Sequence, residues 1–275
     1  TSYLAPIMAV IYVFSSILVL IYHSEKIGES FGLIFNGVFN PKATIIGAGG
    51  GAVMTMLNTM LMGIKRGLYS NEAGQGSAAI AHSAAKTNFP VREGAVAMLG
   101  PYIDTIIICT LTGLVILCTG AWQHTEYFVS ISATSINEFN QSISQNNFRG
   151  LELINGSLLT SFAFKNGLSW IFSFGDKIIT LSVLLFATST AISWSFYGDR
   201  ATEYLFGEKA IYWYRLVYIF FVFIGANASI EAVWAFGDAA LGFMTFPNLI
   251  SIVFLTGALK KMTTKYFKHD YESKG

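Results

Sequence analysis

The sequence predicts an all-α membrane protein with six transmembrane helices, and two observations support this. First, 53% of the 275 residues are hydrophobic and 12% are charged, whereas an ordinary soluble domain carries about 25% charged residues. Second, the apolar residues gather in six runs close to the length of about 20 residues that a helix needs to cross the hydrocarbon core. The net charge of +1 gives no electrostatic reason to expect a nucleic-acid partner.

Three predicted spans precede a long polar segment. Residues 5–22 form the first span and are slightly short for it. Residues 44–64 have the required length, although they begin with several glycines. Residues 94–118 form the third span, a mostly apolar run that follows Arg92 and Glu93. We therefore expect the chain to cross the membrane three times in this part.

The polar segment at residues 119–174 is rich in Ser and Asn and too polar to cross a membrane. We expect it to form a loop on the outer side. Three further spans follow at residues 176–197, 211–228 and 232–258. The lysine-rich residues 259–275 are expected to form a polar tail.

Basic residues are distributed unequally between the two sides that these six spans define. One side holds twelve of them: Lys65, Arg66, Lys86, Arg92, Arg200, Lys209, Arg215, Lys260, Lys261, Lys265, Lys268 and Lys274. The other side holds five: Lys26, Lys42, Arg149, Lys165 and Lys177. The positive-inside rule places the first side, and with it the C-terminus, in the cytoplasm. Removing any one span would scramble this asymmetry, so it supports all six together.

The second span begins with a run of glycines, Gly49, Gly50 and Gly51 among them. Each glycine costs about 1 kcal/mol relative to alanine inside a helix, so the sequence predicts a broken helix here. Interrupted helices of secondary transporters place free backbone groups around the substrate and its coupling ion. Alternatively, the glycines start the helix at the outer membrane edge or let a neighbouring helix approach closely. Asn58, further along the span, either faces a cavity or bonds a neighbouring helix.

Hydroxyl groups cluster in the fourth span, where Thr188, Ser189 and Thr190 stand close to Trp194. Thr190 and Trp194 are four residues apart and share one helix face. Hydroxyl oxygens suit a hard monovalent cation, and a tryptophan ring can enclose a small organic substrate. The alternative is that each hydroxyl bonds a carbonyl of its own helix, which is common and inert.

Asp104 lies ten residues into the third span. Ionisable groups inside a membrane are functional candidates by default. Asp104 therefore either binds a cation or forms a hydrogen bond, for example to backbone freed by Pro101. In the last span, Pro247 and Asn248 are expected to form a kink with a local polar partner.

A short polar stretch follows the second span on the cytoplasmic side. Lys65, Arg66 and Glu72 in this stretch are candidates for an ion pair that gates the inner side. The alternative is structural: Ser70 or Asn71 caps a helix at residues 77–86, and Glu72 lies favourably near its N-terminus.

Four segments, in order along the chain, resemble the alanine/glycine:cation symporter family. They are residues 63–77 (GIKRGLYSNEAGQGS), 90–110 (from PVREG to IDTIIICT), 186–198 (FATSTAISWSFYG) and 233–249 (from VW to MTFPNL). Together they extend over nearly the whole chain except residues 119–174.

The resemblance implies a fold similar to that of sodium-coupled transporters built from two inverted five-helix repeats. Residues 1–275 would then form a single transmembrane domain that is a fragment of the whole. Residues 5–22 would be the last helix of repeat one, and residues 44–258 would be repeat two. The rest of the first repeat would be an N-terminal partner outside this sequence.

The resemblance also implies roles for particular residues. Thr190 and Trp194 would bind the substrate, and Ser189 would bind sodium. The residue patterns described above add Gly49, Gly50 and Gly51 as candidates for the substrate, Thr188 for sodium, and Arg66, Glu72, Asp104 and Asn58 for gating or ion linkage. Family members often carry an aromatic residue after the glycine pair, where this chain has Gly51, so the preferred substrate size stays open.

The expected function is sodium-coupled symport of a small neutral amino acid, alanine or glycine, by alternating access in a bacterial inner membrane. Sodium is the coupling ion and no cofactor is expected. The alternatives are a proton-coupled carrier, a channel or an intramembrane enzyme. A channel would show charge rings or carbonyl filters repeated in symmetric subunits, and an enzyme would show a catalytic constellation. The sequence contains neither pattern.

Overall fold

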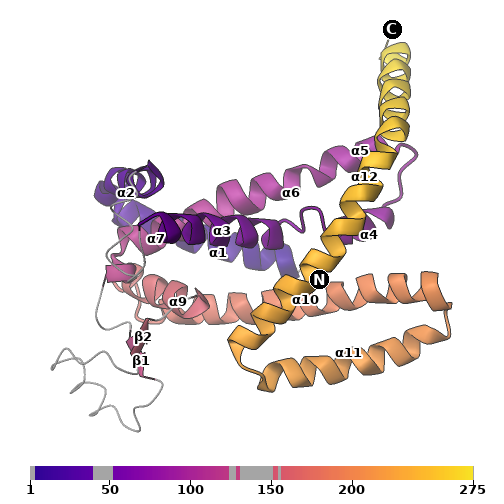
Figure 1. Ribbon diagram of the computed structural model, residues 1–275. Helices are drawn as coiled ribbons and strands as arrows, with labels where there is room; N and C mark the ends of the chain where they lie inside the picture. Colours follow the sequence, from indigo (N-terminus) through magenta and orange to yellow (C-terminus); the bar gives the residue numbers. More distant parts are fainter. Residues whose placement is uncertain (1–3, 40–51, 124–127, 131–150, 154–155, 275) are drawn as a thin grey trace. The chain divides into compact units, whose positions relative to one another are not determined.

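The computed structural model describes residues 4–39, 52–123, 128–130, 151–153 and 156–274 (Figure 1). Gly49, Gly50 and Gly51 lie outside the described residues, as does the first part of the predicted span at 44–64. The all-helical class is confirmed, with one addition. The short strands β1 (Phe128–Ser130) and β2 (Leu151–Leu153) pair antiparallel within the segment expected to be a loop.

The helices of the first half are short or interrupted. They are α1 (Leu4–Tyr22), α2 (Ile27–Phe39), α3 (Ala52–Ser70), α4 (Ser77–Ser83), α5 (Pro90–Ala97), α6 (Leu99–Pro101), a π-helix (Tyr102–Cys109) and α7 (Thr110–Cys118), with 3-10 turns at Ser24–Lys26 and Ala121–Gln123. The second half begins with the short helix α9 (Gly156–Gly167) and continues with α10 (Gly175–Phe206), α11 (Ala210–Asn227) and α12 (Ile230–Lys274), of which α10 and α12 are the longest described helices.

Four helical stretches among the described residues are long and apolar enough to cross a membrane. They are Pro90–Cys118, Gly175–Phe206, Ala210–Asn227 and Ala232–Lys268. They contain or closely match the predicted spans at 94–118, 176–197, 211–228 and 232–258. The stretches Pro6–Tyr22 and Ser24–Gly37 meet at 83° and together would make a fifth span. The number six stays a prediction, because α3 begins at Ala52 and the residues before it are not described.

Helix ends differ from the predicted span ends. The predicted polar tail continues α12 as helix as far as Lys274, and α10 extends to Phe206. Lysine and glutamate are good helix formers, so a helix persists where hydropathy ends. The expected outer loop likewise contains α9. Hydropathy predicts which residues can lie in the hydrocarbon core, but a helix can continue past them into polar sequence.

The chain divides into two compact units, each described here by itself. One comprises residues 1–58 and 107–189, and the other comprises residues 59–106 and 190–275. The core of the first unit joins α1, α7 and α9 through the buried side chains Val19, Val115 and Phe164. Gly167 permits this contact, because a Cβ there would lie 2.6 Å from Val19 Cγ1.

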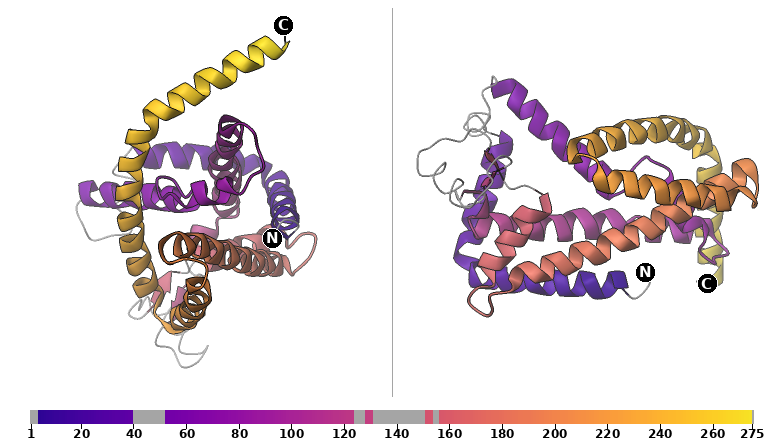
Figure 2. Two further views of the ribbon diagram at one scale, coloured as in Figure 1. Left: turned by 90° about the vertical axis from the view of Figure 1, so that its right-hand side faces the viewer. Right: turned by 90° about the horizontal axis from the view of Figure 1, so that it is seen from below.

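In the second unit, the last part of α10 and α11 run side by side in opposite directions (Figures 1 and 2). The apolar side chains of α11 are exposed; Phe220, Phe221 and Phe223 are 60%, 57% and 68% accessible. A helix that is hydrophobic on all sides is typical of a membrane span. The surface therefore suits lipid or neighbouring helices.

Candidate functional site

The loop between α3 and α4, residues 71–76 (the signature loop), has an unusual backbone. Glu72, Gly74 and Gly76 have φ angles of 50°, 76° and 85°. Positive φ suits glycine but is uncommon for other residues, and strained positions persist only where their surroundings hold them. Here the Ala73 amide and the Gln75 Nε2 both donate to the Leu68 carbonyl, at 3.1 and 3.0 Å.

The end of α3 and the start of this loop are bound to the π-helix. Ser70 Oγ donates to Asp104 Oδ2. Asn71 and Thr105 exchange two hydrogen bonds, from Asn71 Nδ2 to Thr105 Oγ1 at 2.9 Å and from Thr105 Oγ1 to Asn71 Oδ1 at 3.1 Å. Asp104 thus accepts a side-chain hydrogen bond, one of the alternatives that the sequence left open. π-Helical turns occur frequently at functional sites, and this one carries Asp104.

The same end of α3 is bound to α12. Lys65 Nζ lies 3.1 Å from Asp238 Oδ2. The Arg66 guanidinium lies 3.6 Å from the centre of the Trp234 ring, a cation–π contact. The Tyr69 ring meets Trp234 edge-on, with centroids 5.5 Å apart. Consecutive turns of α3 therefore hold the first turns of α12.

Asn248 connects α12 to the signature loop, which the sequence did not predict. Its Nδ2 donates to the Gly74 carbonyl at 2.8 Å. A Cβ at Gly76 would lie 3.0 Å from Asn248 Oδ1. The expectation that Asn248 is a local polar partner within its own helix is wrong, because this side chain binds a loop 174 residues away in the sequence. The kink at Pro247 stays a prediction.

The structure pairs neither Lys65 nor Arg66 with Glu72. Arg66 stacks on Trp234, and within the described residues Arg66 Nη1 and Glu72 Oε2 are buried without a hydrogen-bond partner. Gln75 Oε1 and Ser77 Oγ share this condition. Buried polar groups normally find partners, so four unsatisfied atoms within twelve residues mark an unusual segment.

The capping interpretation is wrong. Gly76 occupies the N-cap position of α4, and no side chain caps it. Ser70 and Asn71 instead bond the π-helix. Asn58, a further gate candidate, lies in α3, and of this residue only the backbone is described.

On α10, the predicted sodium ligands bond their own helix. Thr188 Oγ1 donates to the Leu184 carbonyl at 2.8 Å, and Ser189 Oγ donates to the Phe186 carbonyl at 2.9 Å. A hydroxyl that donates its proton in this way still offers its lone pairs to a cation. Thr190 and Trp194 are half-buried one turn apart, and the Trp194 ring meets Tyr197 edge-on at 5.8 Å.

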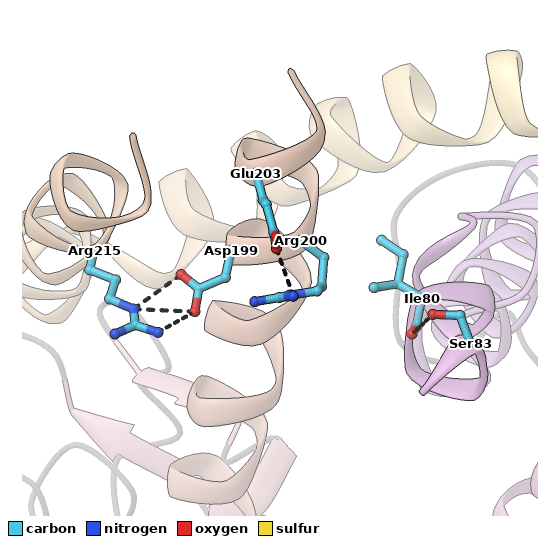
Figure 3. Close-up of polar contacts among 6 residues, drawn as sticks. All are labelled: Ile80, Ser83, Asp199, Arg200, Glu203 and Arg215. Atoms are coloured by element: carbon cyan, nitrogen blue, oxygen red, sulfur yellow. Dashed lines mark hydrogen bonds and ion pairs between the residues drawn. The ribbon is translucent and has the colours of Figure 1, made fainter. Parts of the chain in front are cut away.

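One ion pair was missed entirely from the sequence. Asp199 at the end of α10 is 6% exposed and accepts three hydrogen bonds from Arg215 on α11, the shortest 2.7 Å from Nη2 to Oδ2 (Figure 3). Tyr218 OH donates to the Ala191 carbonyl at 2.8 Å. Both contacts fasten α11 to the part of α10 that carries Thr190 and Trp194. Asp199 and Arg215 both lie near ends of predicted spans, where a charged side chain is expected to have a partner of opposite charge. This expectation could have indicated the pair from the sequence.

Apolar helices of membrane length, joined by ion pairs and by polar contacts to a tight loop, define a multi-pass membrane protein. The family model for the sodium:alanine symporter family matches residues 1–275. The chain therefore belongs to the sodium:alanine symporter family, which makes it part of a transporter and not of an enzyme.

Relatives agree with this assignment. The chain is 36% identical to the sodium/alanine symporter of Methanococcus maripaludis, over 97% of this chain and 51% of that protein. It is 33% identical to the sodium/proton-dependent alanine carrier protein of a Bacillus species, over 91% of this chain and 52% of that protein. The probable sodium/glutamine symporter of Bacillus subtilis is 28% identical over 91% of this chain. The chain spans about half the length of the curated relatives it matches.

Proposed function

We propose that this chain is part of a secondary active transporter that couples sodium entry to the uptake of a small neutral amino acid, alanine or glycine. The observation that carries the proposal is the family match over residues 1–275, supported by relatives whose names include sodium and alanine. The carrier works by alternating access in a bacterial inner membrane. The positive-inside rule supports a cytoplasmic C-terminus.

The proposed substrate site lies on α10. Thr190 and Trp194 bind the amino acid on one helix face, and the hydroxyl oxygens of Ser189 and Thr188 bind sodium. Gly49, Gly50 and Gly51 complete the substrate site with free backbone groups. In such carriers the site forms between two repeats at the bilayer midplane. Residues 44–258 are proposed as the second repeat and residues 5–22 as the last helix of the first, so the remaining ligands come from the partner repeat.

The proposed gate uses the unsatisfied atoms of the segment after α3. Arg66 Nη1 and Glu72 Oε2 are buried and lack partners among the described residues. Leaving such groups unpaired costs about 1–3 kcal/mol each, and a second conformation that pairs them would remove this cost. Asp104 and Asn58 act in the same transition. Arg66 would leave Trp234 as the gate closes.

The experiment uses the gene product that contains this chain, reconstituted in liposomes. Labelled alanine uptake is followed with an inward sodium gradient and with potassium as control, for the unmutated protein and for Thr190→Ala. We expect uphill uptake that needs sodium and an apparent alanine affinity that falls about tenfold in the variant, since a lost hydrogen bond to a charged ligand costs about 1.5 kcal/mol or more. Thr180→Ala is the control, because Thr180 is another threonine of α10 that the proposal gives no role; its Oγ1 donates to the Asp176 carbonyl of the same helix.

Different outcomes of this experiment test the site, the coupling ion and the transport mechanism separately. Sodium-dependent uptake that Thr190→Ala leaves unchanged would keep the function and reject the site. Uptake driven by an imposed proton gradient without sodium would favour the proton-coupled alternative, which the name of the Bacillus carrier makes worth testing. Alanine that equilibrates without accumulating would indicate a channel.

A further inference from the structure

A cavity of 330 Å³ lies between the end of α3, the signature loop and α12. Its polar wall consists of Lys65, Tyr69, Gln75, Asp238 and Thr245, and the rest of its wall is apolar. Ligand pockets span about 300–1,000 Å³, so this volume suits a small molecule. None of the residues proposed above for substrate or sodium lines this cavity.

The charges in the cavity wall are of opposite sign and adjacent. Lys65 Nζ and Asp238 Oδ2 are 3.1 Å apart, and their side chains are 54% and 33% exposed. An exposed ion pair contributes about 0–1 kcal/mol, so a ligand can open this one at little cost. Lys65 repels a bare metal cation, and Asp238 repels a simple anion. A zwitterion satisfies both: its carboxylate pairs with Lys65 and its ammonium with Asp238.

Gln75 supplies a third, independent observation. It is 4% exposed, and its Nε2 donates to the Leu68 carbonyl. Its Oε1 is buried and has no hydrogen-bond partner among the described residues. A buried acceptor without a partner calls for one. An ammonium group carries three donors, so it can bond Asp238 and a nearby neutral acceptor together.

We propose that this cavity is a second binding site for a zwitterionic small neutral amino acid, formed by different residues from the site on α10. The inference rests on the proposed function, because it takes the ligand to be the transported amino acid. The site holds the substrate at the membrane face that carries the signature loop, where it enters or leaves the protein. The apolar wall, with Leu68 and Leu241, accommodates a short aliphatic side chain.

The test measures the half-saturating alanine concentration separately at each face of the liposome membrane. Lys65→Met and Asp238→Asn each remove one charge while preserving most of the side-chain volume. We expect each variant to raise the value at the signature-loop face about tenfold, as expected for loss of one charge-assisted contact. The value at the opposite face stays unchanged. Lys86→Met is the matched control, because Lys86 is an exposed lysine of the same unit that does not line the cavity.

Two results would overturn the proposal. Unchanged values at both faces, or an equal rise at both, would show that the pair does not bind substrate at one face. The double variant Lys65→Asp with Asp238→Lys exchanges the two charges, so that Gln75 would lie beside the carboxylate of the amino acid and not beside its ammonium group. If this variant fully restores the half-saturating alanine concentration, the pair only fastens α3 to α12.

Failure of the proposed function can be distinguished from failure of the second binding site, because the unmutated protein would then lack sodium-driven alanine uptake. Equilibrium binding of labelled alanine to the purified protein then decides about the cavity. Binding that Asp238→Asn abolishes supports the site, and absence of binding overturns it.

Discussion

At the scale of single residues, Gly76 has two independent reasons to be glycine. Its φ of 85° lies in the left-handed region, and a Cβ would approach Asn248 Oδ1 to 3.0 Å. Gly76→Ala should therefore lower the free energy of unfolding by about 1–3 kcal/mol and loosen the bond between Asn248 and the Gly74 carbonyl. Thermal unfolding of the purified protein in detergent measures the effect.

Gly67→Ala is the control for this prediction. Gly67 lies inside α3 with nothing within 4 Å of an added Cβ, so alanine there should be neutral or raise stability by up to about 1 kcal/mol. Equal losses in the two variants would contradict the explanation from backbone geometry.

The sequence pointed to individual residues of the candidate site, but it did not give their partners. The sequence singled out Arg66, Glu72 and Asp104, and the structure places all three in or beside a single polar segment. Arg66 stacks on Trp234, which is 168 residues away in the sequence, and Ser70 donates a hydrogen bond to Asp104, which is 34 residues away. Pattern and spacing carry no information about such distant contacts when only one sequence is in view.

At the scale of helices, Figure 3 shows two kinds of ion pair on α10, of which one joins α10 to α11 and the other lies within α10. Asp199 is buried and bonded by Arg215 from the other helix, whereas Arg200 bonds Glu203 three residues along on the same helix. Removing the partner of a buried charge leaves it uncompensated; an exposed pair within one helix contributes little. Arg215→Met should therefore destabilise the protein clearly more than Arg200→Met in thermal unfolding.

The same comparison tests the link from structure to transport. Because Arg215 and Tyr218 fasten α11 to the part of α10 that carries Thr190, Arg215→Met should also lower the rate of alanine uptake, and Arg200→Met should not. The exchanged pair Asp199→Arg with Arg215→Asp should recover part of the loss. An Arg215→Met protein as stable and active as its Arg200→Met counterpart would exclude this role for the pair.

Helices were predictable as spans and unpredictable at their ends. Four of the six predicted spans match long apolar helices because burial in lipid demands a continuous apolar run. The sequence did not predict three features of the backbone. These are the bend of 83° after Tyr22, the π-helix after Pro101 and the continuation of α12 past residue 258. Hydropathy therefore locates the membrane-embedded residues better than it defines the shape of the backbone.

At the scale of the whole molecule, the orientation in the membrane rests on the distribution of basic residues, twelve against five. The rule counts Lys and Arg near span ends. α12 continues as helix to Lys274, so the lysines from Lys260 to Lys274 lie on the same helix as the predicted span at 232–258, beyond its end. The cytoplasmic position of the C-terminus stays a prediction from the distribution of basic residues.

Reporter fusions test this orientation in living cells. Green fluorescent protein joined after Lys274 should fluoresce, and alkaline phosphatase at the same position should be inactive, because the phosphatase folds only outside the cytoplasm, where disulfides form. Fusions after Gly120, which follows the span ending at Cys118, should behave in the opposite way. Two fusion sites separated by three crossings must report opposite sides, whereas the same result at both would mean an even number of crossings between them. That outcome would remove one span from the second half and break the charge asymmetry on which the orientation depends.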